Sequence, residues 1–242
     1  MPPAFETDTG IPVPAVTTEQ MREIDRIAIE ETGPNLYQMM ENAGRSLATL
    51  ALDTLGPHWG EAQVMVLAGA GGNGGGAICA ARHLANRGAR VTLCLASPDR
   101  LGEVPVWQLK VYRSTPGRSV DASGVAGERP DLVLDGLIGY SLTGAPSGAY
   151  RGLIDWANDS GAPVLSLDVP SGIDATDGRA PGAHIRPHTT MTLALPKTGL
   201  LSSVTGALML ADIGIPDQTY RRMGLAYVPP FGDRYVIPLR SR

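Results

Sequence analysis

The stretch VMVLAGAGGNGGGAICAARHLANRG, residues 64–88, decides the fold of this chain. It opens with an apolar run typical of a strand buried on both faces, breaks into glycines, and restarts as a run of helix-forming residues. Six of the nine residues 69–77 are glycine, so the backbone there can lie close against a ligand. The unpaired N–H groups that open the following helix favour an anionic group such as a phosphate.

Two other interpretations of this turn are open. Gly69, Gly71 and Gly74 fit the G-x-G-x-x-G pattern of a conventional NAD redox site. That pattern also requires an acidic side chain at the tip of the second strand, and the predicted strand over residues 89–96 offers only Asp99, beyond a proline. Alternatively, the glycines only let the helix and the strand pack closely.

Composition narrows the class of protein. A chain of 242 residues, 43% hydrophobic and 18% charged, suits one large globular α/β domain. With a net charge of −4 and no run of Lys or Arg, we expect no nucleic-acid partner and no binding to anionic membranes. We see no apolar stretch long enough to span a bilayer and no signal-peptide pattern, and so expect a cytoplasmic protein. Cys79 and Cys94 are predicted to be reduced core residues.

Helices and strands alternate along the chain. Residues 1–16 hold four prolines and are predicted to form a flexible N-terminal arm, with residues 17–242 as a single domain. Helices are expected over residues 19–31, 36–55, 101–113 and 150–158. Further strands are expected over residues 131–134, 164–172, 189–195 and 207–211, with a short edge strand over 234–237. This order predicts an α/β fold with a mostly parallel, doubly wound sheet.

Polar, oxygen-bearing residues follow three of the predicted strands. Asn73 lies in the glycine turn, Asp135 ends a second strand, and Asp168 and Ser171 end a third. Ligands of open parallel sheets bind beyond the carboxyl ends of the strands, and amide, carboxylate and hydroxyl oxygens suit a hard cation better than zinc. None of the four histidines has a spacing that demands a metal: His58, His83, His184 and His188.

Asp168 is the strongest single candidate for a functional residue. A carboxylate after a buried strand, beside a proline and facing the glycine turn, is a candidate for proton transfer or direct ligand contact. The alternatives are that it caps the backbone N–H groups of residues 170–173, or that it only binds an ion.

Six motifs carry a family resemblance. They are MMENAG (residues 39–44), GAGGNGGGAICAARHL (69–84), LDGLIG (134–139), LDVPSGID (167–174), PKTGL (196–200) and DIGIP (212–216). Together and in this order they are specific, and over roughly residues 17–216 the chain resembles the YjeF N-terminal domain family, whose best-known members are NAD(P)H-hydrate epimerases.

The resemblance implies a Rossmann-like three-layer α/β/α sandwich, usually a homodimer, that interconverts the R and S epimers of hydrated NADH or NADPH as a repair step. It places a potassium ion on Asn73, Asp135 and Ser171, and the reacting hydrate at Asp168. It implies a separate ADP- or ATP-dependent NAD(P)HX dehydratase as a partner. It also places the substrate contacts on Gly72, Asn73, Gly74, Gly75, Gly76, Gly139, Tyr140, Ser141, Leu142, Thr143, Gly144, Ala145 and Asp168.

The chain departs from the family pattern at a few positions. Where members typically read N-N-G-G-D-G, Gly72 and Gly76 replace the first asparagine and the acid. Tyr140 introduces a bulky phenol beside the expected phosphate path, and His188 stands where an aspartate is common. Our leading hypothesis is an epimerase. The alternatives are a catalytically degenerate nucleotide-binding or protein-interaction module, and an enzyme acting on another phosphorylated or adenylated metabolite.

Overall fold

The computed structural model describes residues 5–241. Its α-helices are α1 (Thr18–Ile27), α2 (Leu36–Leu55), α3 (Gly72–Ala85), α4 (Glu103–Tyr112), α5 (Gly148–Asp159), α6 (Ser202–Thr205) and α7 (Asp217–Arg222). Its strands are β1 (Phe5–Thr7), β2 (Pro12–Val13), β3 (Gln63–Ala68), β4 (Arg90–Leu95), β5 (Arg118–Val120), β6 (Leu132–Gly136), β7 (Val164–Leu167), β8 (Thr189–Leu193), β9 (Ala207–Ala211) and β10 (Val236–Ser241). No helix in this part of the chain is long and apolar enough to cross a membrane.

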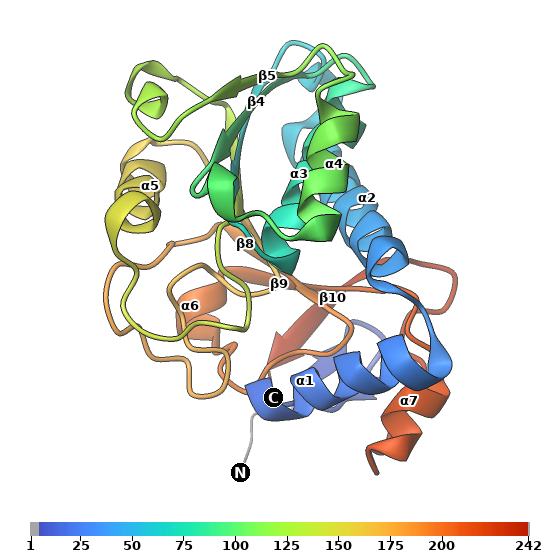
Figure 1. Ribbon diagram of the computed structural model, residues 1–242. Helices are drawn as coiled ribbons and strands as arrows, with labels where there is room; N and C mark the ends of the chain where they lie inside the picture. Colours follow the sequence, from blue (N-terminus) through green and yellow to red (C-terminus); the bar gives the residue numbers. More distant parts are fainter. Residues whose placement is uncertain (1–4, 242) are drawn as a thin grey trace.

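The strands form a single sheet in the order β2-β1-β10-β9-β8-β7-β6-β3-β4-β5 (Figure 1). Neighbours from β9 to β5 are parallel, whereas β10, β1 and β2 pair antiparallel at one end. From β3 the chain builds outward through β4 and β5 on one side and through β6 to β9 on the other. The switch point, where such sheets bind ligands, therefore lies between β3 and β6.

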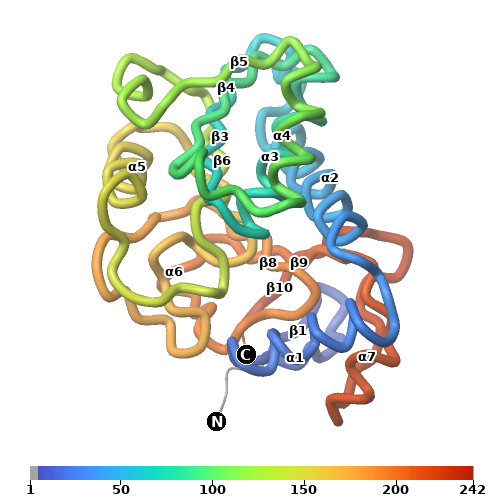
Figure 2. The backbone as a smooth tube through the Cα atoms, in the orientation of Figure 1, coloured from blue at the N-terminus to red at the C-terminus, as the bar shows by residue number. Residues whose placement is uncertain are grey.

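Helices cover both faces of the sheet. Along β3, Val64 and Val66 pack into the core beneath α2, α3 and α4, whereas Met65 and Leu67 pack into the core beneath α5. This alternation is what a strand buried on both faces requires. Figure 2 shows α2, α3 and α4 on the side of the sheet opposite to α5. The predicted three-layer α/β/α sandwich with a mostly parallel sheet is confirmed.

The prediction of a flexible arm over residues 1–16 was wrong for residues 5–16, while residues 1–4 lie outside the described part. β1 pairs with β10 and β2 pairs with β1, and Phe5 is only 1% exposed. The prolines argue against regular structure, but proline is tolerated in an edge strand such as β2, and burial of Phe5 and Val13 holds the segment against the sheet.

The last strand also differs from the prediction. The short edge strand expected over residues 234–237 is β10, which lies inside the sheet between β9 and β1. Because the N-terminal segment covers its outer side, β10 has partners on both sides and extends to Ser241.

Candidate active site

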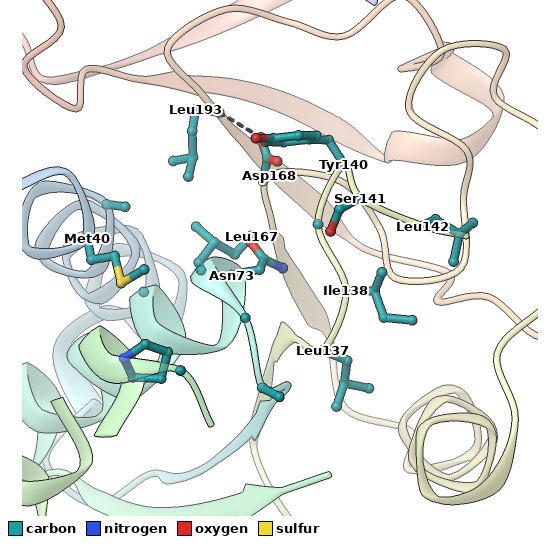
Figure 3. Close-up of a pocket in the computed structure, with 18 of the residues that line it drawn as sticks. Met40, Asn73, Leu137, Ile138, Tyr140, Ser141, Leu142, Leu167, Asp168 and Leu193 are labelled. Carbon is teal, nitrogen blue, oxygen red and sulfur yellow. Dashed lines mark hydrogen bonds between the residues drawn. The ribbon is translucent and has the colours of Figure 1, made fainter. Parts of the chain in front are cut away.

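A cavity of about 1010 Å³ opens at the carboxyl ends of β3, β6 and β7, next to the switch point (Figure 3). Its volume is at the upper end of the range for small-molecule sites, large enough for a nucleotide. Of the residues predicted to contact substrate, those that line the cavity are Gly72, Asn73, Gly76, Gly139, Tyr140, Ser141, Leu142, Thr143, Gly144, Ala145 and Asp168. Gly74 and Gly75 instead pack against the backbone of Gly69 and the side chain of Met40.

The glycine turn between β3 and α3 packs directly on the end of β6. A Cβ on Gly69 would lie 1.9 Å from the carbonyl oxygen of Leu137, and a Cβ on Gly74 would lie 1.9 Å from the carbonyl oxygen of Gly69. A Cβ on Gly71 would have no atom within 4 Å, and Gly71 lines the cavity. Packing therefore requires the first and third glycines of the motif, and the second leaves backbone open to a ligand.

Asn73, in the first turn of α3, points into the cavity (Figure 3). Among residues 5–241, neither its Oδ1 nor its Nδ2 has a hydrogen-bond partner, although both atoms are buried. Gly139 leaves space for this side chain, since a Cβ there would lie 3.3 Å from the Cγ of Asn73. A buried amide without a partner is costly, so this one indicates a position for a ligand or an ion.

Asp135 and Ser171 do not line the cavity themselves, but they are hydrogen-bonded to each other next to residues 137–139, which do. Asp135 is 0% exposed, and its carboxylate accepts hydrogen bonds from the Ser171 hydroxyl (2.5 Å), the Ser171 N–H (3.0 Å), the Ser166 hydroxyl (2.7 Å) and the Leu137 N–H (3.2 Å). Burial raises the pKa of Asp135, against the lowering effect of these donors. The Ser171 oxygen also accepts a bond from the Ile138 N–H at 2.8 Å. Two of the predicted cation ligands, Asn73 and Ser171, thus lie against the segment of residues 135–139 that begins with the third, Asp135.

Asp168 follows β7 directly and is 4% exposed. Its backbone has a φ of 68°, a left-handed conformation that Asp adopts more readily than most residues. Its N–H donates to the carbonyl of Met191 at 2.7 Å, which fixes this conformation against β8. The side chain does not cap residues 170–173 but accepts a hydrogen bond from the N–H of Leu193 at 3.4 Å (Figure 3).

Lys197 is the charge partner of Asp168, and the sequence did not single it out. It is 1% exposed, and its Nζ donates to the Asp168 carboxylate and to the carbonyl of Leu193 (3.0 Å). Backbone bonds between Val16 and the segment containing Lys197 tie this turn to the N-terminal stretch. The sequence signal for this residue is the PKTGL motif, in which a single lysine lies in a mostly uncharged, partly apolar segment.

Tyr140 and Asp25 form a second polar pair on the cavity wall. The Tyr140 hydroxyl donates to Asp25 Oδ2 at 2.5 Å, and the Lys197 Nζ lies 5.9 Å from the centre of the Tyr140 ring. The phenol expected beside a phosphate path is therefore held by α1, next to Asp168 (Figure 3). Sequence reasoning missed Asp25, although a carboxylate four residues after the buried Met21 falls on the apolar face of α1.

A separate polar cluster lies between α2 and α3. The Glu41 carboxylate accepts hydrogen bonds from Arg82 (2.5 Å) and from Cys79 (3.3 Å), and it lies 2.8 Å from His83 Nε2. Because the Arg82 guanidinium already supplies a cation, the cluster does not resemble a metal site. Cys79 and Cys94 are free and buried, as predicted, and burial raises the pKa of each thiol to about 12.

Comparison with known proteins finds relatives over nearly the whole chain. The chain is 52% identical over 238 residues to the NAD(P)H-hydrate epimerase of Dehalogenimonas lykanthroporepellens, covering 98% of this chain and 97% of that protein. It is 37% identical over 223 residues to the bifunctional NAD(P)H-hydrate repair enzyme Nnr of Salinibacter ruber, covering 84% of this chain. That alignment spans only 41% of the bifunctional relative's length.

The fold is also found in a solved structure. The crystal structure of the yeast protein ynu0 matches with a TM-score of 0.78 at 23% identity, covering 93% of this chain and 100% of the yeast chain. The family described as YjeF-related protein N-terminus matches residues 36–199. The resemblance inferred from the six motifs is thereby confirmed, and the chain belongs to the family of YjeF-related protein N-termini.

Proposed function

We infer that this chain is an isomerase, an NAD(P)H-hydrate epimerase that interconverts the R and S epimers of hydrated NADH and NADPH in the repair of nicotinamide nucleotides. Its similarity to an epimerase runs over nearly the full length of both chains. The structural observation that carries the proposal is a buried carboxylate, Asp168, on the wall of a cavity large enough for a nucleotide.

Asp168 is the proposed catalytic residue. Epimerisation breaks one bond of the hydrated carbon, to its hydroxyl oxygen or to the ring nitrogen, and re-forms the same bond on the other face of that carbon. The departing atom gains a proton as the bond breaks and loses it as the bond re-forms, so the reaction needs a group that exchanges protons there. Asp168 presents a carboxylate to the cavity, and Lys197 compensates its charge without filling the cavity. The substrate contacts we propose are the N-terminus of α3 with its glycine turn, suited to phosphate, and the loop of residues 139–145.

We propose a potassium ion at Asn73, Asp135 and Ser171. The unpartnered amide oxygen of Asn73 is the observation that fits this ion, because it is a buried acceptor without a donor among the described residues. The side-chain atoms that these three residues would offer to the ion are all oxygens, which suits a hard cation. The single carboxylate, that of Asp135, matches a single positive charge. The ion would supply a fixed positive charge that orders this side of the cavity.

The wider setting is also proposed. A separate ADP- or ATP-dependent NAD(P)HX dehydratase would consume the S epimer, in keeping with the bifunctional repair enzyme among the relatives. We further propose a homodimer in the cytoplasm. Light scattering of the purified protein tests the dimer, and cell fractionation tests the compartment.

The decisive assay supplies purified (R)-NADHX and follows its epimerisation with an S-specific dehydratase. We expect turnover in potassium and a strong loss when tetramethylammonium replaces it. Asn73→Ala should raise the potassium concentration needed for half-maximal rate while leaving the circular dichroism spectrum unchanged. An inactive wild-type protein that still binds the nucleotide would overturn the epimerase and favour an interaction module.

A further inference from the structure

Asp25 is a carboxylate on an otherwise apolar surface. In α1 the buried residues are Met21, Ile24 and Ile27, and Asp25 lies four positions after Met21 on the side that lines the cavity. Burial raises its pKa, and the nearby Asp168 acts in the same direction, whereas Tyr140 and Lys197 lower it. A carboxylate in such a place costs stability relative to an apolar residue of the same size.

The contacts of Asp25 lead to the proposed catalytic pair. Asp25 holds the Tyr140 hydroxyl, the Tyr140 ring faces the Nζ of Lys197, and that Nζ contacts Asp168. The Tyr140 carbonyl also accepts a bond from the Thr18 hydroxyl at 3.4 Å, so α1 holds both the backbone and the side chain of this residue. The four side chains come from four separate segments of the chain.

Tyr140 acts by fixing the orientation of its ring, not by carrying a negative charge. Burial and the neighbouring Asp25 raise the pKa of its phenol, which therefore stays protonated and donates to the carboxylate. With its hydroxyl fixed at one end, the ring has one position beside Lys197. Tyr140 is also the first residue of the loop 140–147, which lines the cavity.

We propose that Asp25 is a positioning residue of this site: by holding the Tyr140 hydroxyl it keeps the aromatic ring beside the Asp168–Lys197 pair and the following loop against the substrate. This rests on the proposed epimerase function. It explains the half-buried acid in α1 as a requirement of the reaction, because small displacements of positioning groups cost up to about 100-fold in rate.

The test compares Asp25→Leu, Tyr140→Phe and their double variant in the (R)-NADHX assay. We expect each to lower kcat/KM by about tenfold to 100-fold, and the double variant to lose no more than the worse single variant, because both remove the same hydrogen bond. The double variant leaves neither partner of this half-buried hydrogen bond unpaired, so its Tm should equal or exceed that of the wild type. Lower activity at an undiminished Tm separates positioning from a structural role.

Two further variants complete the design. Asp25→Asn keeps an oxygen acceptor for the phenol and should retain activity within about threefold. Glu23→Gln is the matched control. It removes a carboxylate from the same helix, and that carboxylate is exposed and pairs with the surface residue Arg26. Additive losses, or a double variant with wild-type kcat/KM, would overturn the proposal. An inactive wild-type protein would instead overturn the epimerase function itself.

Discussion

The Asp168 carboxylate and the Lys197 ammonium form a buried ion pair that joins the end of β7 to the turn after β8. Its two charges are removed from water, so each depends on the other. The same pair places the proposed proton-transferring group at the wall of the cavity, which links the stability of this corner of the molecule to its chemistry.

Replacing only one residue of the pair should destabilise the protein more than replacing both. Lys197→Met leaves a buried carboxylate without its cation and should lower the free energy of unfolding by about 3–5 kcal/mol. Adding Asp168→Asn to that variant should recover part of the loss. Urea unfolding of the four proteins of this cycle measures the coupling, and strictly additive effects would show that the two side chains act independently.

Asp168→Asn should lower the epimerisation rate by about 10²- to 10⁴-fold, the usual contribution of general acid–base catalysis. Asn is the informative substitution because it tolerates the left-handed backbone at this position, whereas Ala would add a strain of about 1–2 kcal/mol. Steady-state kinetics with a circular dichroism control check the result. A fully active Asp168→Asn protein would remove Asp168 from the mechanism.

The three glycines of the G-x-G-x-x-G motif should respond differently to alanine. Gly69→Ala and Gly74→Ala place a Cβ into backbone atoms and should each destabilise the protein by at least about 1–3 kcal/mol. Gly71→Ala has free space and serves as the matched variant, with stability within about 0.5 kcal/mol of the wild type. If the substrate approaches this backbone, Gly71→Ala should raise KM. Equal stability of all three variants in urea would contradict the packing.

Glu41 should contribute stability that depends on pH. Although burial opposes it, the hydrogen bonds from Arg82 and His83 lower the pKa of Glu41 from 4.5 to about 2. Because the folded pKa lies below the unfolded value, the contribution is complete above pH 4.5 and is lost as the pH falls toward 2. The difference in Tm between wild type and Glu41→Gln should therefore shrink over this range. A difference that stays constant would contradict the assignment.

Cys79 and Cys94 should not react with a thiol reagent in the native protein at pH 8. Both are buried, and their pKa values of about 12 leave almost no thiolate at that pH. Titration with Ellman's reagent should detect both thiols in guanidinium chloride and neither without it. Rapid labelling of one of them in the native protein would show that its helix or strand opens.

Much of the fold could be read from local patterns. Val64 and its neighbours predict a doubly buried strand, and the glycines after them predict a tight turn and a helix, because these preferences depend on residues close in the sequence. The N-terminal segment shows where this fails. Its prolines argue against regular structure, and only the distant β10 provides the edge on which Phe5 and Val13 are buried.

The sequence by itself determined the α/β class, the glycine turn that holds Asn73, and the position of Asp135 and Asp168 at strand ends with Ser171 shortly after, because strand ends follow from hydrophobic periodicity. Only the tertiary structure decided which side chains meet there. Lys197 pairs with a residue 29 positions away, and Tyr140 with one 115 positions away. Such pairings depend on how the sheet and α1 bring the segments together, and no local preference encodes them.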